Sequence, residues 1–143
     1  MSKIWFGARF ALASVGGVAS WLFGGFDYLF IVLIAFVVVD YITGVMSAIV
    51  QKKLSSAVGA KGILKKVLII LIIAIGQLID MLLHSPGVLR TALIFFYVAN
   101  EGVSIIENAA IIGLPVPETL KKVLAQIKKK GEGDEGGEKN EQN

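Results

Sequence analysis

The sequence predicts an all-α integral membrane protein, and three observations predict that class. Of the 143 residues, 55% are hydrophobic and 17% charged, whereas a soluble domain has about 45–50% apolar and about 25% charged residues. Several apolar runs reach the length of roughly 17–25 residues that crosses a bilayer. Basic residues gather in short segments beside those runs, as they do in the loops that orient membrane proteins. We therefore expect three transmembrane helices, an N-terminal spanning or interfacial helix and a C-terminal basic amphipathic helix.

The central part of the chain predicts three spans. Residues 28–50 form an apolar run of spanning length. Residues 51–66 are rich in lysine and contain two glycines, so we expect a basic loop that overlaps the start of a second span at 64–84. Ser85 is a suitable N-cap and Pro86 a suitable first residue for a third helix, at 87–112. Gly113, Pro115 and Pro117 are expected to end it.

The two ends of the chain differ from this central part. Residues 4–26 are long enough to span but contain Arg9 and five glycines, so an interfacial helix is an open alternative. Residues 118–130 place apolar residues at helical spacing among lysines, which predicts a basic amphipathic helix on an anionic leaflet. Residues 131–143 are acidic and glycine-rich, and we expect a disordered tail there. Residues 1–130 would form the membrane domain.

The lysines predict the orientation of the chain, because short Lys-rich loops stay on the cytoplasmic side. We therefore expect a multi-pass protein of the bacterial cytoplasmic membrane with a cytoplasmic C-terminus. Three or four spans are both compatible with this pattern. The lysines expected at the membrane surface are Lys52, Lys53, Lys61, Lys65, Lys66, Lys121, Lys122, Lys128, Lys129 and Lys130.

Composition argues against several functional classes. The chain has no cysteine and one histidine, His84, so redox chemistry and multi-histidine metal sites are not expected. It has no phosphate-binding loop, no nucleophile elbow and no inverted repeat typical of a transporter. We predict that the protein is not an enzyme, uses no cofactor or metal and binds no nucleic acid. Its partner would be the lipid bilayer.

Polar residues form one stripe on each predicted span. A charged group in hydrocarbon is costly unless it is paired, protonated or wetted, so each stripe needs an explanation. The stripes could be interhelical glue within a bundle, or they could meet across subunits and line a wet opening. Asp80 could also pair with Arg90 near the outer surface. The striped residues are Asp40, Thr43 and Ser47; Gln77 and Asp80; and Asn100, Glu101, Ser104, Glu107 and Asn108.

Small residues predict close helix contacts on two segments. Gly16, Ser20 and Gly24 recur at four-residue steps in the N-terminal segment, and Gly44 and Ala48 lie beside the Asp40 stripe. Such strips allow helices to approach closely within or between subunits.

Several of these motifs together resemble a known family. They are the run Asp40 to Gly44, the loop segment Lys53 to Ser56, the block Leu89 to Gly102, and Ser104 to Asn108 followed by Gly113 to Pro117. The chain resembles the toxin-secretion and phage-lysis holins over residues 4–127. The resemblance implies a homo-oligomer that accumulates in the cytoplasmic membrane and opens timed lesions. An endolysin or a secreted toxin would leave through them without a required direct contact. The alternative is a small ion channel or a membrane scaffold.

Overall fold

The computed structural model describes residues 2–133, and no strand occurs among them. The helices are α1 (Ser2–Phe23), α2 (Tyr28–Val50), α3 (Ser56–Leu82), α4 (Val88–Ile112) and α5 (Glu118–Glu132). Helices α1 to α4 are each long and apolar enough to cross a membrane. The prediction of an all-α membrane protein is confirmed. Of the predicted tail, residues 131 and 132 extend α5, and the part from residue 134 onward lies outside the described residues.

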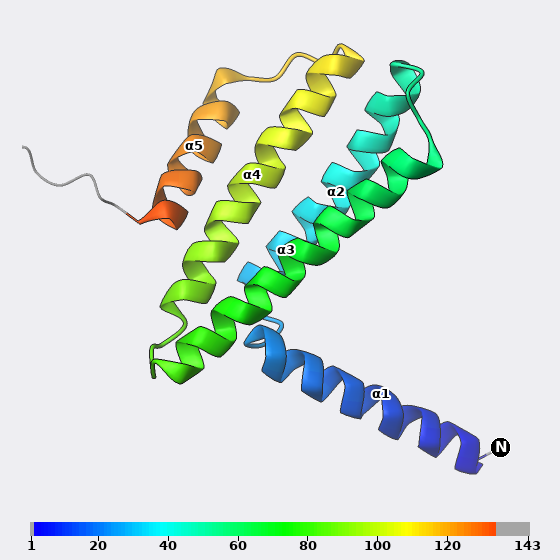
Figure 1. Cartoon of the computed structure of the whole chain (residues 1–143), viewed down its shortest axis with the longest axis vertical. Coiled ribbons are helices and arrows are strands. Elements are labelled where there is room, and N and C mark those ends of the chain that lie inside the picture. The colour runs from blue at the N-terminus through cyan, green and yellow to red at the C-terminus, as the bar shows by residue number, and fades with distance from the viewer. Residues whose placement is uncertain (1, 134–143) are drawn as a thin grey trace, which may run out of the picture.

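Helices α2, α3 and α4 form an antiparallel bundle in which α4 packs against both of the others (Figure 1). The connections α1–α2 and α3–α4 lie at one end of this bundle, here called the α3–α4 end. The connections α2–α3 and α4–α5 lie at the opposite end, here called the α2–α3 end. Helices α2 and α3 make few contacts with each other, so α4 holds the bundle together.

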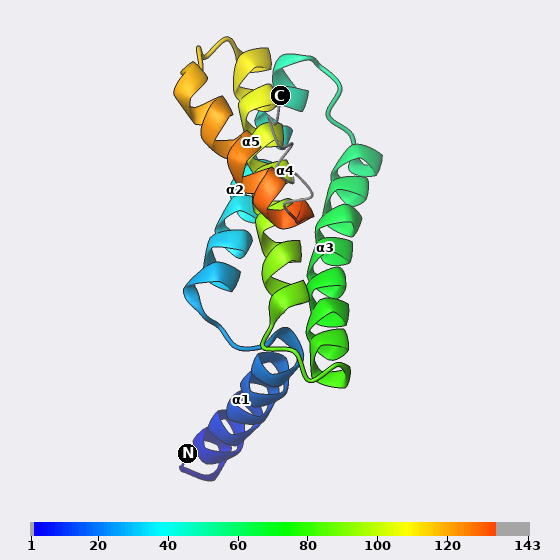
Figure 2. The same ribbon diagram turned by 90° about the vertical axis from the view of Figure 1, so that its left-hand side faces the viewer.

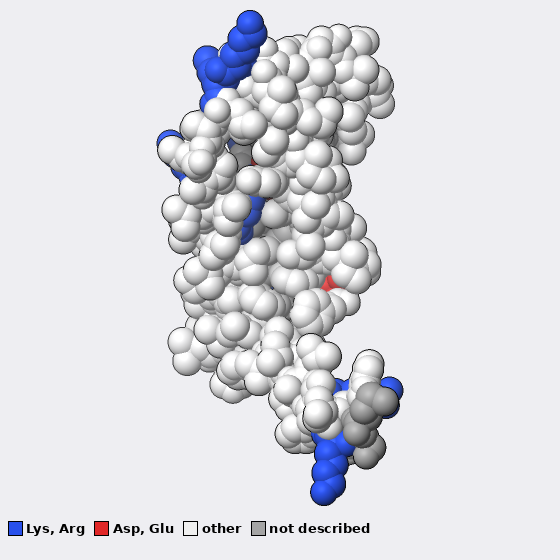
Figure 3. Space-filling model, turned by 90° about the vertical axis from the view of Figure 1, so that its right-hand side faces the viewer, with Lys and Arg blue, Asp and Glu red and all other residues white. Residues whose placement is uncertain are grey.

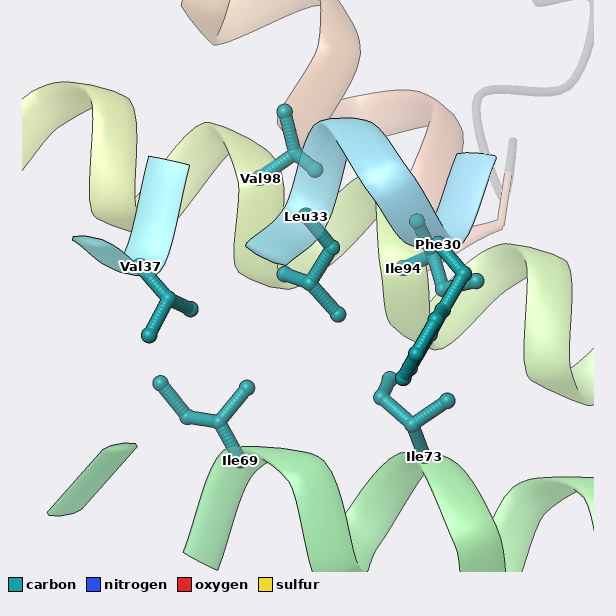
Figure 4. Packing of buried hydrophobic residues seen from close by; sticks show 7 residues of the cluster. All are labelled: Phe30, Leu33, Val37, Ile69, Ile73, Ile94 and Val98. Carbon is teal, nitrogen blue, oxygen red and sulfur yellow. The ribbon is translucent and has the colours of Figure 1, made fainter. Parts of the chain in front are cut away.

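The hydrophobic core lies between the three bundle helices (Figure 4). Each helix contributes residues three or four apart, because this spacing places side chains on one helical face. Leu33, Ile73 and Ile94 are completely or almost completely buried. The core cluster consists of Phe30, Leu33 and Val37 from α2, Ile69 and Ile73 from α3, and Ile94 and Val98 from α4.

Helix α3 begins eight residues before the predicted position 64. Ser55 caps it, because the Ser55 hydroxyl accepts a hydrogen bond from the Val58 amide at 3.2 Å. Gly59 and Gly62 do not break the helix; they let it approach the Tyr41 ring, which lies 3.2 Å from where a Cβ of Gly62 would be. The predicted basic loop is therefore short, and Lys61, Lys65 and Lys66 lie on α3.

Helix α4 also begins differently from the prediction. Ser85 is not its N-cap, because the Ser85 hydroxyl is bonded to the Asp80 carboxylate instead. Gly87 precedes the helix in the left-handed conformation, with φ of 74°, and Val88 is the first helical residue. Gly113 ends α4 in the same conformation, with φ of 98°, as expected of a glycine that stops a helix.

Helices α1 and α5 lie outside the three-helix bundle. Helix α1 leaves the α3–α4 end at a steep angle to the bundle and packs mainly against α3, while Phe23 at its end stacks on Phe30 of α2 and accepts a hydrogen bond from Arg90 of α4 (Figures 1 and 2). None of the residues in its apolar stretch is buried. Helix α5 folds back along α4 and packs closely against it. One face of the molecule is mostly uncharged between basic patches at its two ends (Figure 3), which suits a surface facing lipid.

Candidate functional site: a charged cluster between the spanning helices

Lys66 joins all three bundle helices through its ammonium group. Its Nζ pairs with the Asp40 carboxylate on α2 and with the Glu101 carboxylate on α4. The three side chains are 16%, 8% and 4% exposed, respectively. The sequence placed Asp40 and Glu101 at similar depth, and the structure connects them through one lysine. Lys66 is therefore part of a buried ion cluster, which corrects its predicted place at the membrane surface.

Two neutral side chains complete this charged cluster. The Asn108 amide donates hydrogen bonds to Asp40 Oδ1 at 3.2 Å and to Thr43 Oγ1 at 3.1 Å. The Thr43 hydroxyl in turn donates to the Asp40 carbonyl at 3.1 Å. Among the described residues, no buried side-chain nitrogen or oxygen lacks a hydrogen-bond partner. Asn108 of the α4 stripe thus bonds directly to Asp40 and Thr43 of the α2 stripe within one chain.

The cluster lies near the middle of the spans. Asp40 follows the start of α2 by twelve residues and Glu101 follows the start of α4 by thirteen, which at 1.5 Å per residue is about 18–20 Å. A lone charge at such a depth costs about 2.5–3.5 kcal/mol on insertion scales. Pairing offsets this cost, so the three charges are interdependent: removing one leaves the others buried without a partner.

Two open hollows adjoin the cluster. One, of about 190 Å³, is lined by Asp40, Lys66, Ser104 and Asn108 together with Tyr41 and the start of α3. The other, of about 280 Å³, is lined by Asp40, Lys66, Asn100, Glu101 and Ser104 with apolar residues of α3. Each is larger than the ~30 Å³ that one water molecule occupies, and each has several polar groups to hold water. Both hollows are therefore large enough to hold water beside the cluster.

The other predicted polar residues are divided between inward and outward positions. Ser47 is buried, and its hydroxyl accepts a hydrogen bond from the Gln51 amide at 3.0 Å. Ser104 is half-buried at the hollows. Asn100 and Glu107 are exposed on α4, although Asn100 lies at mid-span. Outward polar groups at this depth need water or another polar surface in a bilayer.

A second cluster at the α3–α4 end corrects the predicted Asp80–Arg90 pair. The Asp80 carboxylate accepts from the backbone amides of Leu89 and Arg90, at 3.0 and 2.7 Å. The Arg90 guanidinium points to the α1–α2 turn instead. It donates to both Asp27 carboxylate oxygens, at 2.9 and 3.0 Å, and to the carbonyls of Phe23 and Gly25. These bonds from Arg90 lower the pKa of Asp27 below its ordinary value.

The predicted small-residue contacts occur mainly inside the chain. A Cβ at Gly24 would lie 2.5 Å from Gln77 Oε1 and 2.7 Å from Arg90 Nε, so Gly24 packs directly against α3 and α4. Gly44 lies beside the Asn108 amide, and Ala48 is buried. A Cβ at Gly16 would meet no side chain or other helix within 4 Å. Ser20 is half-buried near the end of α1.

Helix α5 packs into an apolar groove, here called the seat, that is lined by residues of α2 and α4 such as Phe36 and Gly102. Leu124 is 4% exposed and lies against Gly102, where any Cβ would be 2.6 Å from Leu124 Cδ2. All five α5 lysines are exposed, namely Lys121, Lys122, Lys128, Lys129 and Lys130, as are Lys52 and Lys53 beyond α2. The sequence predicted this helix on the leaflet surface, whereas the structure packs it lengthwise against α4.

Sequence reasoning missed the role of Arg90 and the place of Lys66. Arg90 is one of only two arginines in the chain and lies in the first turn of the helix after Ser85-Pro86-Gly87, which was the available signal. Lys66 directly precedes an apolar run, as a snorkelling lysine does, so its spacing alone could not reveal its partners. Within residues 2–133, no three His, Asp or Glu side chains are grouped to hold a metal ion.

The fold and cluster define a multi-pass helical membrane protein with a buried ion cluster at mid-span. The sequence profile of the bacteriophage holin family matches residues 17–129, and the chain belongs to that family. The chain is similar to an uncharacterized 14.9 kDa protein of the nagH 3′ region of Clostridium perfringens, with 39% identity over 85% of this chain and 93% of the relative. It is also similar to an uncharacterized protein of Listeria monocytogenes, with 42% identity over 92% of this chain and 94% of the relative. No solved structure matches the chain.

Proposed function

We propose that this chain oligomerises in the bacterial cytoplasmic membrane and opens lesions at a defined time. An endolysin or a secreted toxin then crosses the membrane without direct contact being required. Membership of the holin family supports this role. The observation that carries it is the Lys66 cluster, since ion pairs at mid-span beside two hollows are costly in a purely structural bundle and useful in one that becomes wet.

The outward polar residues of α4 support assembly. Asn100 is exposed at mid-span while the neighbouring Glu101 is satisfied inside the chain. In a raft of subunits, Asn100 and Glu107 would face polar groups of other copies or water. A rearrangement that separates Lys66 from its two carboxylates would add those charges to the same wet face. The closed and open states are then two packings of similar energy, and assembly shifts their populations.

The lysine distribution supports a cytoplasmic C-terminus. The exposed Lys52 and Lys53 belong to the α2–α3 connection. The α4–α5 connection lies at the same end of the bundle. Short basic segments stay on the cytoplasmic side, so this end faces inward and the α3–α4 end faces outward.

Release of a cytosolic protein tests the proposal. The chain is expressed together with a cell-wall hydrolase that lacks an export signal, while culture density and release of a cytosolic reporter enzyme are followed. A delayed, abrupt density drop with reporter release, dependent on both proteins, is expected. Loss of membrane potential without hydrolase escape would instead indicate an ion-sized channel. No effect at verified membrane levels would indicate a scaffold.

A further inference from the structure

Helix α5 has one apolar face, and that face can bind either the groove between α2 and α4 or a lipid surface. In the structure, Leu124 is buried against α4, and Leu120 lines the same apolar groove with Phe36. Leu120, Val123 and the lysines nevertheless remain exposed. An amphipathic helix with this distribution also binds an anionic lipid surface, with apolar residues in the lipid and lysines at the headgroups. Because both surfaces use the same apolar residues, α5 can occupy only one of them at a time.

The position of α5 on α4 puts two of its lysines at an unfavourable depth in a bilayer. Lys130 Nζ lies 5.1 Å from the Phe95 ring centre, and Lys128 Nζ lies 5.9 Å from that of Phe96. Phe95 is seven residues from the α3–α4 end of α4, or about 11 Å, and about 25 Å from the other end. When α4 spans a bilayer, exposed lysines at this depth are inside the hydrocarbon region unless they reach the headgroups, which weakens this position of α5 in any bilayer, so that an anionic leaflet can compete with it.

The connection between α4 and α5 allows the helix to leave. Residues 114–117 are not helical and follow Gly113, which is left-handed with φ of 98°. Helix α5 starts at Glu118 with no side-chain hydrogen bond capping its first turn. The connection lies at the same end of the bundle as the α2–α3 connection, which carries the exposed Lys52 and Lys53.

We propose that α5 exchanges between its seat on α4 and the surface of an anionic leaflet. Five lysines against two glutamates on α5 provide the attraction to anionic headgroups. Leaving the seat uncovers the close-packing position Gly102 on α4. This inference concerns lipid binding by one helix and does not depend on lesion formation, so either can fail without the other.

Cross-linking tests the exchange, because the chain has no cysteine of its own. The Phe96→Cys/Lys128→Cys protein is treated with a short bifunctional maleimide in neutral detergent micelles and in vesicles of phosphatidylcholine with or without phosphatidylglycerol. We expect an efficient intramolecular cross-link in micelles. The yield should fall roughly tenfold when phosphatidylglycerol is added to the vesicles, given the attraction of several lysines to anionic lipid. A Phe96→Cys/Lys121→Cys pair, with the second site about 10 Å further along α5, is the geometric control.

Charge variants identify the cause. Lys121→Gln/Lys122→Gln/Lys129→Gln removes three exposed lysines, none of which has an ion pair or ring contact with α4 among the described residues, and it should abolish the effect of phosphatidylglycerol. Lys52→Gln/Lys53→Gln/Lys61→Gln removes three charges elsewhere and should leave the effect intact. Two results would overturn the proposal: no cross-link in micelles, or a yield that does not change with phosphatidylglycerol.

Discussion

The Lys66 ammonium and the Glu101 carboxylate, 35 residues apart in the chain, form an ion pair in the middle of the bundle. The same ammonium holds Asp40, so a single side chain connects α2, α3 and α4. Few direct contacts link α2 with α3. The cluster therefore contributes to holding α3 in place as well as carrying the only ion pairs between bundle helices at mid-span among residues 2–133.

Replacing Lys66 should destabilise the fold strongly. Lys66→Met leaves two buried carboxylates without their cation, and breaking a buried pair in this way costs about 3–5 kcal/mol. Thermal unfolding in detergent micelles, followed by circular dichroism, measures the loss. Lys65→Met is the matched control, because Lys65 is exposed and should stay within about 0.5 kcal/mol of the parent. Equal stability of the two variants would exclude a structural role for the cluster.

Neutralising either carboxyl should change the time of lysis. Asp40→Asn and Glu101→Gln each remove an ion pair with Lys66 and weaken the closed packing, so we expect earlier lysis at equal membrane level. Glu118→Gln is the control, because Glu118 is exposed on α5 and pairs only with Lys121 among the described residues. Unchanged timing in both cluster variants would mean that the cluster serves only as interhelical glue.

The Asp27–Arg90 pair should make stability depend on acid pH. Hydrogen bonds from Arg90 lower the pKa of Asp27 in the folded protein, so the pair stabilises the fold above the ordinary aspartate pKa of about 3.9 and is lost as the pH falls through the lower folded value. Asp27→Asn should reduce the melting temperature at pH 7, by a modest amount because the side chain is 41% exposed. The difference from the parent should shrink below about pH 4. A difference independent of pH would contradict this account.

Alanine variants of two adjacent glycines should distinguish the effect of backbone strain from the effect of close packing. Gly24 and Gly25 both have positive φ, 78° and 98°, so alanine at either position is strained by about 1–2 kcal/mol. Only Gly24 has neighbours, since a Cβ there would meet Gln77 and Arg90. Gly24→Ala should therefore be less stable than Gly25→Ala, by about 1–3 kcal/mol for the overpacking. Denaturant unfolding in micelles measures both, and equal losses would show that the turn alone matters.

The fold was largely predictable because its signals are local. Apolar runs and turn residues lie next to each other in the chain, so the five helices and their order follow from hydropathy and from Gly, Pro and Ser positions. The start of α3 was missed because glycine usually interrupts a helix. At Gly59 and Gly62 the helix persists where glycine allows the Tyr41 ring to approach, and that contact cannot be read from spacing.

The sequence by itself determined that the chain has spanning helices, which polar residues lie within them, and that Asp40 and Glu101 lie at similar depth, because periodicity and rise per residue are local properties. Only the tertiary structure decided which groups the long charged side chains and helix α5 contact. It placed Lys66 between the two carboxylates, turned Arg90 toward Asp27, and laid α5 along α4. Long side chains reach several positions from one backbone site, so the packing of neighbouring helices selects their partner.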